Sequence, residues 1–439
     1  MEIISLPDEN EEIRNQRQAM VDGLKTLGAI QIPPVEEAFR AIPRHLFVPE
    51  AQTQRAYTDT HIVTRERDGK ALSSSSMPSL MAMMLEMLNL QPGQRVLEIG
   101  AGTGYNAALM AHLVGATGEV VTIEIDEDIV QDARAHLLAA GIENVQVICS
   151  DGSTGWAERA PYDALILTVS SADIAPAWRE QLQPGGRLIL PLQLTLFDSK
   201  LASSPLPSDQ FLLSFQWTGK VFEGLDCRLC TFIPLRGDLA PSESKTCRNG
   251  PEASLSALLA NDIDAPGIFQ VLRGPGQDEE TAVHLSFLDM SGLRTWLALR
   301  EPRFCEIYVQ EGTNAGEIPV QLRKDATFAA AIGLCEPQAC CLLMLQEEKS
   351  EQAKDSKRPF NLIIRQFGAA RELAEQLRTQ VIAWDQAGRP FIWNTEGRMK
   401  DLRVRAWPTE AFSPPHPLEC VITRKHTRFV FTPQATKRS

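Results

Sequence analysis

The sequence lacks any long hydrophobic run. Its most apolar stretch, Leu80 to Leu90, is about half of the roughly 20 residues that a membrane-spanning helix needs, and it contains Glu86. Residues 1–17 are acidic, so they also lack the basic start and apolar core of an export signal. We therefore expect a cytoplasmic protein that does not cross a membrane.

Cysteine is sparse. The nine cysteines in 439 residues are too few for a disulfide framework, and we expect free thiols. Cys227 and Cys230 have the spacing of zinc ligands, and Cys335, Cys340 and Cys341 could complete a site. The first pair lies on an expected strand, however, where side chains three residues apart face opposite sides. We therefore predict no metal site.

Positive charge is in deficit, because 43 Lys and Arg residues stand against 56 Asp and Glu residues, for a net charge of −13. This balance argues against nucleic acid as the main partner. The hydrophobic share of 44% and the charged share of 23% are typical of a folded soluble protein. The length indicates two or three domains.

Helices dominate the predicted structure of residues 1–90. An amphipathic helix is expected over Glu11–Leu27, a second over Val35–Ala41 and an apolar one over Leu80–Leu90. The residues between the last two helices, 43–76, are expected to be a loop.

From Arg95 onward, short β-rich runs alternate with helical segments. The expected strands are Arg95–Ile99, Val120–Glu124, Val145–Cys149, Ala164–Thr168 and Arg187–Leu192. The helices expected between them are Tyr105–Val114, Glu127–Ala140 and Ile174–Leu182. This alternation predicts an α/β domain over residues 91–237, with a doubly wound, mostly parallel sheet that binds its ligand beyond the carboxyl ends of the strands.

A different pattern begins after Gly237, and we expect a separate α+β domain over residues 238–439. Its expected elements are a strand over Phe360–Gln366, a helix over Ala369–Trp384 and strands over Arg403–Trp407 and Cys420–Thr432.

Three glycines, Gly100, Gly102 and Gly104, follow the first expected strand and open a helix. Glycine allows a tight turn and a close approach of the backbone to a ligand. A dinucleotide is the first alternative, but its fingerprint is Gly-x-Gly-x-x-Gly, which this segment does not match. The acidic Glu98 ahead of the glycines is instead the pattern of S-adenosylmethionine binding.

The next two strands also end in acidic residues. Glu124 is placed to accept both ribose hydroxyls of a nucleoside, and Asp151, followed by Gly152, is placed where an adenine amino group would lie. Each acid could instead cap a helix, and for Asp126 or Glu127 that alternative is equally good. Together the three strand ends favour a nucleoside site.

At this point the sequence resembles the protein-L-isoaspartate O-methyltransferases over about residues 10 to 237. The similar segments are Val35–Pro49, Glu98–Tyr105, Asp151-Gly152, Ala160–Asp163, Leu182–Pro191 and Phe232–Arg236. The resemblance implies a Rossmann-like class I methyltransferase that takes S-adenosylmethionine as cofactor and a protein or peptide as substrate. Within that frame we also place Thr168 among the substrate-binding residues.

One loop departs from the family pattern. The repair enzymes carry Gly-x-Thr-Ile-Ser-x-Pro, whereas this sequence has Ser73-Ser74-Ser75-Ser76-Met77-Pro78. This loop and the long C-terminal extension are similar to the FxLD-type branch and its relatives in ribosomal-peptide (RiPP) biosynthesis. Those relatives methylate an aspartate of a precursor peptide, and the ester collapses to an aspartimide.

The resemblance makes Ser76 the expected catalytic residue and Ser73–Ser76 the substrate-binding loop. Methyl transfer to an aspartyl carboxylate needs no general base, because a group with a pKa of about 4 is already ionised at neutral pH. A hydroxyl such as that of Ser76 can orient the carboxylate without competing for the methyl group. The alternative is that the serines form only a flexible polar turn.

Three other functions remain open. The chain could be a repair-type isoaspartate methyltransferase, a non-catalytic S-adenosylmethionine-binding scaffold or, less favoured, an RNA methyltransferase. Basic residues near the C-terminus suggest capture of an acidic peptide, although an ordinary solvated sheet face explains them equally well. These residues are Arg398, Lys400, Arg403, Arg405, Arg424, Lys425 and Arg428.

Overall fold

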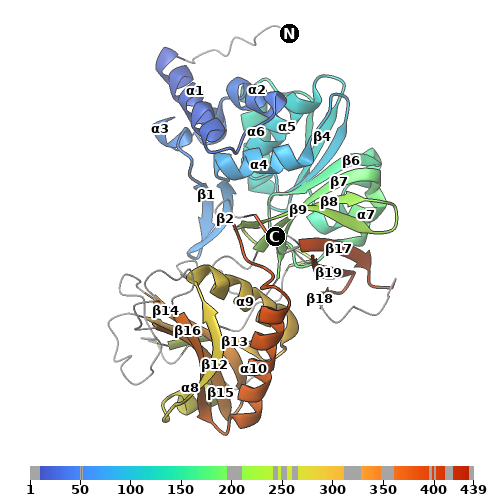
Figure 1. Ribbon diagram of the computed structural model, residues 1–439. Coiled ribbons are helices and arrows are strands. Elements are labelled where there is room, and N and C mark those ends of the chain that lie inside the picture. Colours follow the sequence, from blue (N-terminus) through green and yellow to red (C-terminus); the bar gives the residue numbers. More distant parts are fainter. Residues whose placement is uncertain are drawn as a thin grey trace.

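The computed structural model describes residues 10–49, 51, 53–194, 210–240, 246–248, 255–259, 265–310, 328–347, 360–394, 398–399, 402–410 and 419–434. They form two units, which Figure 1 shows one above the other with the N-terminal helices at the top. Each unit is built on its own large sheet.

The N-terminal helices lie close to their expected positions. They are α1 (Glu11–Thr26), α2 (Pro33–Ala41) and α4 (Pro78–Leu88). The short α3 (Thr53–Ala56) was not expected, and it lies within the residues predicted to be a loop. The Asn10 side chain caps α1 by accepting a hydrogen bond from the Ile13 N–H at 2.9 Å. Two prolines open α2, where the missing N–H groups cost nothing.

The expected loop over residues 43–76 is wrong in part, because it contains a β-hairpin. Strands β1 (Ile62–Arg67) and β2 (Lys70–Ser75) pair antiparallel. Asp68 and Gly69 join them with φ of 53° and 70°, as a tight hairpin turn requires. The charged β1 sequence lacks the apolar alternation that would predict a strand. The serine-rich loop is therefore the end of a strand.

The first sheet has ten strands in the order β18-β19-β17-β9-β8-β7-β6-β3-β4-β5. Its parallel strands are β3 (Arg95–Ile99), β4 (Glu119–Glu124), β5 (Val145–Cys149), β6 (Tyr162–Leu167) and β7 (Leu182–Gln193). The antiparallel strands β8 (Gln210–Trp217) and β9 (Phe222–Cys230) follow β7. Helices of this unit are α5 (Tyr105–Val114), α6 (Glu127–Ala139) and α7 (Pro176–Gln181). The Rossmann-like, mostly parallel arrangement is confirmed.

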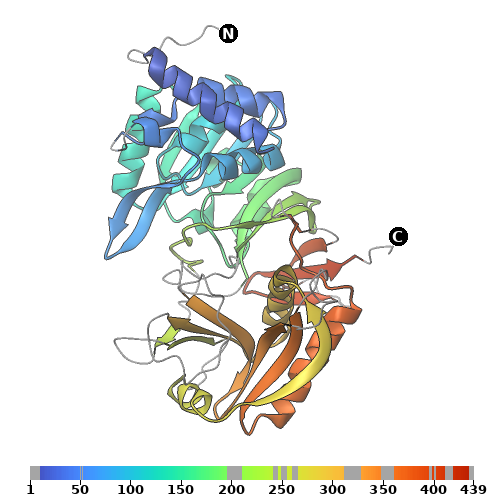
Figure 2. The ribbon, with the colours of Figure 1, turned by 60° about the vertical axis from the view of Figure 1, so that its left-hand side comes forward.

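The C-terminal strands correct the expected domain boundary. Strands β17 (Leu402–Pro408), β18 (Cys420–Thr423) and β19 (Thr427–Pro433) return to the first sheet, where β17 pairs with β9. In both views these red strands lie between the upper layers and the lower unit (Figures 1 and 2). Residues 238–439 are therefore not one separate domain. The sequence did not predict this, because the periodicity of a strand does not reveal the strand with which it pairs.

The lower unit is inserted between β9 and β17. Its seven-stranded antiparallel sheet has the order β10-β11-β13-β14-β15-β16-β12. The strands are β10 (Thr246–Arg248), β11 (Leu255–Leu259), β12 (Gln277–Leu285), β13 (Phe304–Gln310), β14 (Phe328–Glu336), β15 (Ala339–Glu347) and β16 (Phe360–Gly368). The helices are α8 (Ala265–Leu272), α9 (Phe287–Arg300) and α10 (Arg371–Gln386). The strand and helix expected over residues 360–384 are present, and the insert has α+β character.

Alternate residues of the strands face different hydrophobic cores. In the insert, Leu362 and Ile364 pack with the Trp296 and Trp384 of α9 and α10, whereas Ile363 packs with α8. In the first sheet, Cys227 and Cys230 belong to different cores, so the two thiols lie on opposite faces of β9. None of the helices in the described ranges is both long and apolar enough to span a membrane.

Candidate active site

The glycine-rich turn after β3 depends on glycine in two ways. Gly100, Gly102 and Gly104 have φ of +100°, +51° and +84°, the left-handed region that other residues rarely adopt. A Cβ on Gly100 would also lie 2.7 Å from the Thr168 Oγ1. The turn therefore has no room for a larger residue at its first position. Because glycine has no side chain, a ligand at the sheet edge can approach the backbone of the turn closely.

Glu124 lies at the carboxyl end of β4, beside this turn. Its Oε2 accepts a hydrogen bond from the Gly102 N–H at 3.2 Å, and its Oε1 accepts one from the Ile125 N–H at 2.9 Å. Burial raises the pKa of Glu124, although these two N–H groups act to lower it. The carboxylate is thus fixed against the backbone and keeps acceptor sites for a pair of hydroxyls.

A cavity opens at the ends of β3 and β4. Its apolar wall is formed by Leu72, Ile99, Ile123, Val169, Ile233 and Leu235, and its polar groups include Glu124 and Arg236. Gly152 completes one wall, where a Cβ would lie 2.4 Å from the Ile99 Cγ2. Apolar walls with one carboxylate suit a nucleoside, whose flat base needs the former and whose ribose needs the latter. These residues fit S-adenosylmethionine.

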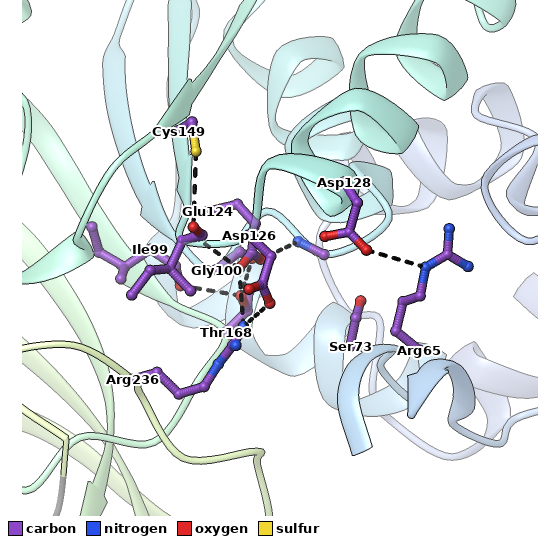
Figure 3. Close-up of polar contacts among 12 residues, drawn as sticks. Arg65, Ser73, Ile99, Gly100, Glu124, Asp126, Asp128, Cys149, Thr168 and Arg236 are labelled. Atoms are coloured by element: carbon purple, nitrogen blue, oxygen red, sulfur yellow. Dashed lines mark hydrogen bonds and ion pairs between the residues drawn. The ribbon is translucent and has the colours of Figure 1, made fainter. Parts of the chain in front are cut away.

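Arg236 is a residue of this cavity that sequence reasoning did not single out. Its Nη2 donates to the Asp126 Oδ2 and lies 3.5 Å from the Glu124 Oε1 (Figure 3). The alternative that Asp126 caps α6 with its side chain is wrong, because that side chain makes no cap hydrogen bond. The only sequence signal was the position of Arg236 at the end of the matched segment Phe232–Arg236.

Two expected cofactor residues lie beside the cavity. Glu98 faces away from Ile99 and is fully buried, with hydrogen bonds from the Asn106 Nδ2 at 2.8 Å and the Thr122 Oγ1 at 2.6 Å. This burial raises the pKa of Glu98 to about 7. Glu98 is therefore part of the support beneath the glycine turn, and it does not line the cavity.

Asp151 likewise has both carboxylate oxygens engaged. They accept hydrogen bonds from the Ser153 N–H and the Asp238 N–H, each at 2.8 Å. Partial burial acts to raise the pKa of Asp151, but these N–H groups lower it below its ordinary value. Asp151 thus ties the chain after Arg236 to the end of β5, beside its neighbour Gly152.

Thr168, which the sequence analysis places among the substrate-binding residues, contacts the glycine turn. Its Oγ1 donates to the Gly100 carbonyl oxygen at 2.5 Å and to the Ile99 carbonyl oxygen at 3.2 Å (Figure 3). The hydroxyl therefore holds the glycine turn against the end of β6, and the substrate-binding role of Thr168 stays a prediction.

The four serines at the end of β2 alternate in burial. Ser73 and Ser75 are buried, whereas Ser74 and Ser76 are partly exposed. The Ser73 Oγ accepts a hydrogen bond from the Thr64 Oγ1 at 3.1 Å, and a Cβ on Gly102 would lie 3.6 Å from it. The serine segment therefore lies against the glycine turn, and Ser76 is one of its two accessible hydroxyls.

Arg44 holds the serine segment from the protein interior. The sequence analysis did not single out this residue. It is fully buried, and its Nη2 donates to the Ser76 carbonyl oxygen at 2.9 Å. Its Nη1 donates to the carbonyl oxygens of Ala56 and Thr58 at 3.0 and 3.2 Å. Backbone dipoles thus solvate the buried charge, although burial lowers the pKa of Arg44.

The hairpin is also attached to the Rossmann-like unit through ion pairs between β1 and α6. Arg65 on β1 forms an ion pair with Asp128 of α6 at 3.8 Å (Figure 3). It also forms an ion pair with Asp132 of the same helix. These contacts hold the hairpin over the strand ends, where Leu72 of β2 closes one wall of the cavity.

Comparisons with known proteins identify one family. The family model "Protein-L-isoaspartate(D-aspartate) O-methyltransferase (PCMT)" matches residues 15–202. Protein-L-isoaspartate O-methyltransferase 2 of Archaeoglobus fulgidus is 44% identical over 158 residues, which cover 36% of this chain and 70% of that protein. Protein-L-isoaspartate O-methyltransferase of Methanopyrus kandleri is 37% identical over 188 residues, which cover 43% of this chain and 81% of that protein.

A solved structure of a protein-L-isoaspartate O-methyltransferase has 24% sequence identity and a TM-score of 0.48, over 89% of this chain and 96% of that one. The two sequence relatives are more than 30% identical to this chain and are covered over more than two thirds of their length. The chain therefore belongs to the protein-L-isoaspartate O-methyltransferase family of S-adenosylmethionine-dependent carboxyl methyltransferases.

Proposed function

We propose that this enzyme methylates the side-chain carboxylate of an aspartate in a peptide made by the ribosome, and that the ester then collapses to an aspartimide. The observation that carries the proposal is the segment Ser73–Ser76. It takes the place of the Gly-x-Thr-Ile-Ser loop of the repair enzymes and lies against the glycine turn. A different acceptor loop beside a retained cofactor cavity favours the same chemistry on a different carboxylate.

The chemistry asks for positioning more than for acid or base groups. S-adenosylmethionine supplies a methyl group on a positively charged sulfur. A carboxylate oxygen of the substrate forms a bond to that methyl group as the sulfur–methyl bond breaks, so no proton has to move. The protein has to align the atoms and exclude water.

Individual residues of the chain meet these needs. Glu124 and the glycine turn hold the nucleoside, and Leu72 on the hairpin covers it. Ser76 donates its hydroxyl hydrogen to the acceptor carboxylate and so sets its direction. Arg44 is a positioning residue, because it fixes the Ser76 backbone from a fully buried site.

The ester needs no further catalyst. The backbone amide nitrogen that follows the methylated aspartate attacks the ester carbonyl, and methanol leaves. A five-membered aspartimide ring remains in the peptide. A neutral ester has a better leaving group than a carboxylate, and this difference is what the methylation provides.

The second candidate is repair of isoaspartyl residues, and the names of the sequence relatives favour it. Mass spectrometry decides between the two when the full chain is given an aspartyl precursor peptide and a generic isoaspartyl peptide of equal length. We expect methyl ester and then methanol loss on the precursor peptide. Efficient methylation of the isoaspartyl peptide alone would overturn the aspartyl proposal.

We also propose that the insert between β9 and β17 helps to select the peptide. A chain ending near Gly237 cannot test this, because it would also remove β17, β18 and β19 from the methyltransferase sheet. The test therefore has to use point variants in the full chain.

A further inference from the structure

The chain that follows β9 forms a strap, residues 233–238, along the cofactor cavity. Residues 233–236 of the strap line the cavity wall. At the start of the strap, the Ser170 N–H donates to the Ile233 carbonyl oxygen at 2.9 Å, and the Leu235 N–H donates to the Ser170 carbonyl oxygen at 2.8 Å. The strap is therefore paired with the chain that leaves β6.

The other end of the strap is fixed by Asp151. The Asp238 N–H donates to the Asp151 Oδ2 at 2.8 Å. Gly237 has a φ of +92°, and a Cβ there would overlap the same carboxylate, so only glycine lets the strap approach so closely. Contacts on both sides thus fix the backbone at position 236. The Arg236 side chain extends from there toward the end of β4 (Figure 3).

Arg236 meets two carboxylates at that strand end. Its Nη2 donates a hydrogen bond to the Asp126 Oδ2 and lies 3.5 Å from the Glu124 Oε1. The second distance is longer than a normal N–H···O hydrogen bond of about 2.7–3.2 Å. Asp126 therefore holds the guanidinium, whereas Glu124 is stabilised by its charge and keeps acceptor sites for a ligand.

Glu124 needs a compensating charge because little water reaches it. Its side chain is 9% exposed, against 33% for Arg236. Burial raises the pKa of Glu124, and the charge of Arg236 acts to lower it, together with the N–H groups around the carboxylate. The other titratable groups near Glu124 are Asp126 after it, Glu98 on β3 and Cys149 on β5. Each of these is neutral or negative, so Arg236 supplies the positive charge.

The basic residues near the C-terminus do not perform this role. Arg403 and Arg405 each pair with a glutamate, at 3.1 and 3.4 Å. Arg424 donates to the backbone carbonyl oxygen of Leu194. Lys400 lies outside the described residues. The described members of this group do not line the cofactor cavity, and the capture of an acidic peptide by them stays a prediction.

We propose that Arg236 is a positioning residue for the cofactor: its positive charge, held in place by Asp126 and the strap, balances the Glu124 carboxylate that binds the ribose hydroxyls. An ionised carboxylate accepts hydrogen bonds more strongly than a neutral acid does. The inference concerns how the nucleoside is held and goes beyond the proposed function, because it applies whichever carboxylate accepts the methyl group.

Calorimetry on the full chain tests the inference. The probe is S-adenosylhomocysteine, which has the nucleoside of the cofactor and no methyl group to transfer. We expect Arg236→Gln to weaken binding about threefold at pH 8 and about thirtyfold at pH 6. Glutamine keeps a donor for Asp126 but has no charge, so the pKa of Glu124 rises. A pKa higher by about 1 lowers the ionised fraction up to about tenfold at the lower pH.

Two features of the experiment separate charge from structure. Glu98 titrates in the same range, because burial raises its pKa to about 7, but it is present in every protein compared. The ratio of parent to variant affinity at each pH therefore removes its contribution. Arg236→Lys keeps the charge, so its ratio should be nearly the same at the two pH values. A residue that only fixed the strap would lower affinity equally at both.

Arg303→Gln is the matched control. Arg303 of the insert is 29% exposed and pairs with Glu301, which is 11% exposed, at 3.7 Å and with Glu336 at 2.5 Å. It bridges two carboxylates as Arg236 does but does not line the cofactor cavity. Its affinity should equal that of the parent at both pH values. A pH-independent loss in Arg236→Gln, a pH-dependent loss in Arg236→Lys or a loss in Arg303→Gln would each overturn the inference.

Discussion

The two sheets of this protein differ in how their strands end. In the first sheet, the parallel strands β3, β4 and β5 end side by side, and each end carries a turn, a carboxylate or a glycine that faces a common edge. In the insert, every pair of neighbouring strands is antiparallel, so adjacent strands end at opposite edges of the sheet, and helices cover both faces. Parallel strands bring their carboxyl ends to one edge and so build the cofactor cavity there, whereas antiparallel strands distribute their ends over both edges.

The largest expected effect is a loss of stability after a substitution that affects only the insert. Arg294 of α9 and Glu306 of β13 form an ion pair in which both side chains are nearly inaccessible. Arg294→Leu leaves a buried carboxylate without its cation, so the free energy of unfolding should fall by about 3–5 kcal/mol. Chemical denaturation measures this loss. Because the pair lies in the insert, S-adenosylmethionine affinity measured by calorimetry should be unchanged, and a parallel loss of affinity would contradict the separation of the two sheets.

The next effect isolates the glycine turn of the first sheet. Gly100→Ala places a Cβ 2.7 Å from the Thr168 Oγ1 at φ of +100°. Crowding and backbone strain together should cost about 3 kcal/mol, or roughly a hundredfold in S-adenosylmethionine affinity. Gly28→Ala is the control, because its φ of +73° gives similar strain with nothing within 4 Å. Equal affinity of the two variants would show that the turn does not shape the cofactor site.

The pH dependence of stability sharpens the same comparison. Burial raises the pKa of Glu98 to about 7 in the folded protein, from an ordinary value of 4.5. A raised pKa means that the folded state holds the proton more tightly, so the stabilisation is complete below about pH 4.5 and is lost as the pH rises through about 7.

Denaturation of the parent and of Glu98→Gln at a series of pH values from about 4 to about 8 measures the contribution of Glu98 to the free energy of unfolding. The difference in free energy of unfolding between the two proteins should change by up to about 3 kcal/mol across that window, in favour of the glutamine variant at high pH. Parallel curves for the two proteins would show that Glu98 titrates normally and is not held as the structure places it.

The smallest effect concerns the accessible hydroxyl. Ser76→Ala should lower the methylation rate about one to two decades, since one hydrogen bond to a charged group is worth about 1.5–3 kcal/mol. Cofactor affinity should hardly change. Ser74→Ala, at the other partly exposed serine, is the control. If Ser74→Ala is slow and Ser76→Ala is as fast as the parent, the hydroxyl that orients the acceptor carboxylate is that of Ser74 and not that of Ser76.

How far the sequence predicts the structure depends on the range of the contacts. Strand β3, helix α5 and strand β5 have the expected bounds, because hydrophobic periodicity and glycine breaks are local signals. The hairpin of β1 and β2 was missed because its strands are polar. The return of β17 to β9 was missed because pairing across the whole insert leaves no local trace.

The same division holds within the candidate site. Glu124, the three glycines and Gly152 were predicted to meet at the strand ends, and they do meet there because parallel strands end at one edge. The hydrogen-bond partners of Glu98, Asp151 and Thr168 were not predicted, since the partner of each side chain comes from another element. Arg44 and Arg236 escaped notice because nothing adjacent in sequence reveals what they bind.

The sequence by itself therefore determined the Rossmann-like core, the family and the order of the strand ends, because all three follow from short-range patterns. Only the tertiary structure decided which carboxylate lines the cavity and where the insert begins and ends. Side-chain direction and strand pairing depend on neighbours that are distant along the chain. The buried contact of Arg44 with the Ser76 carbonyl oxygen can consequently be seen only after the chain has folded.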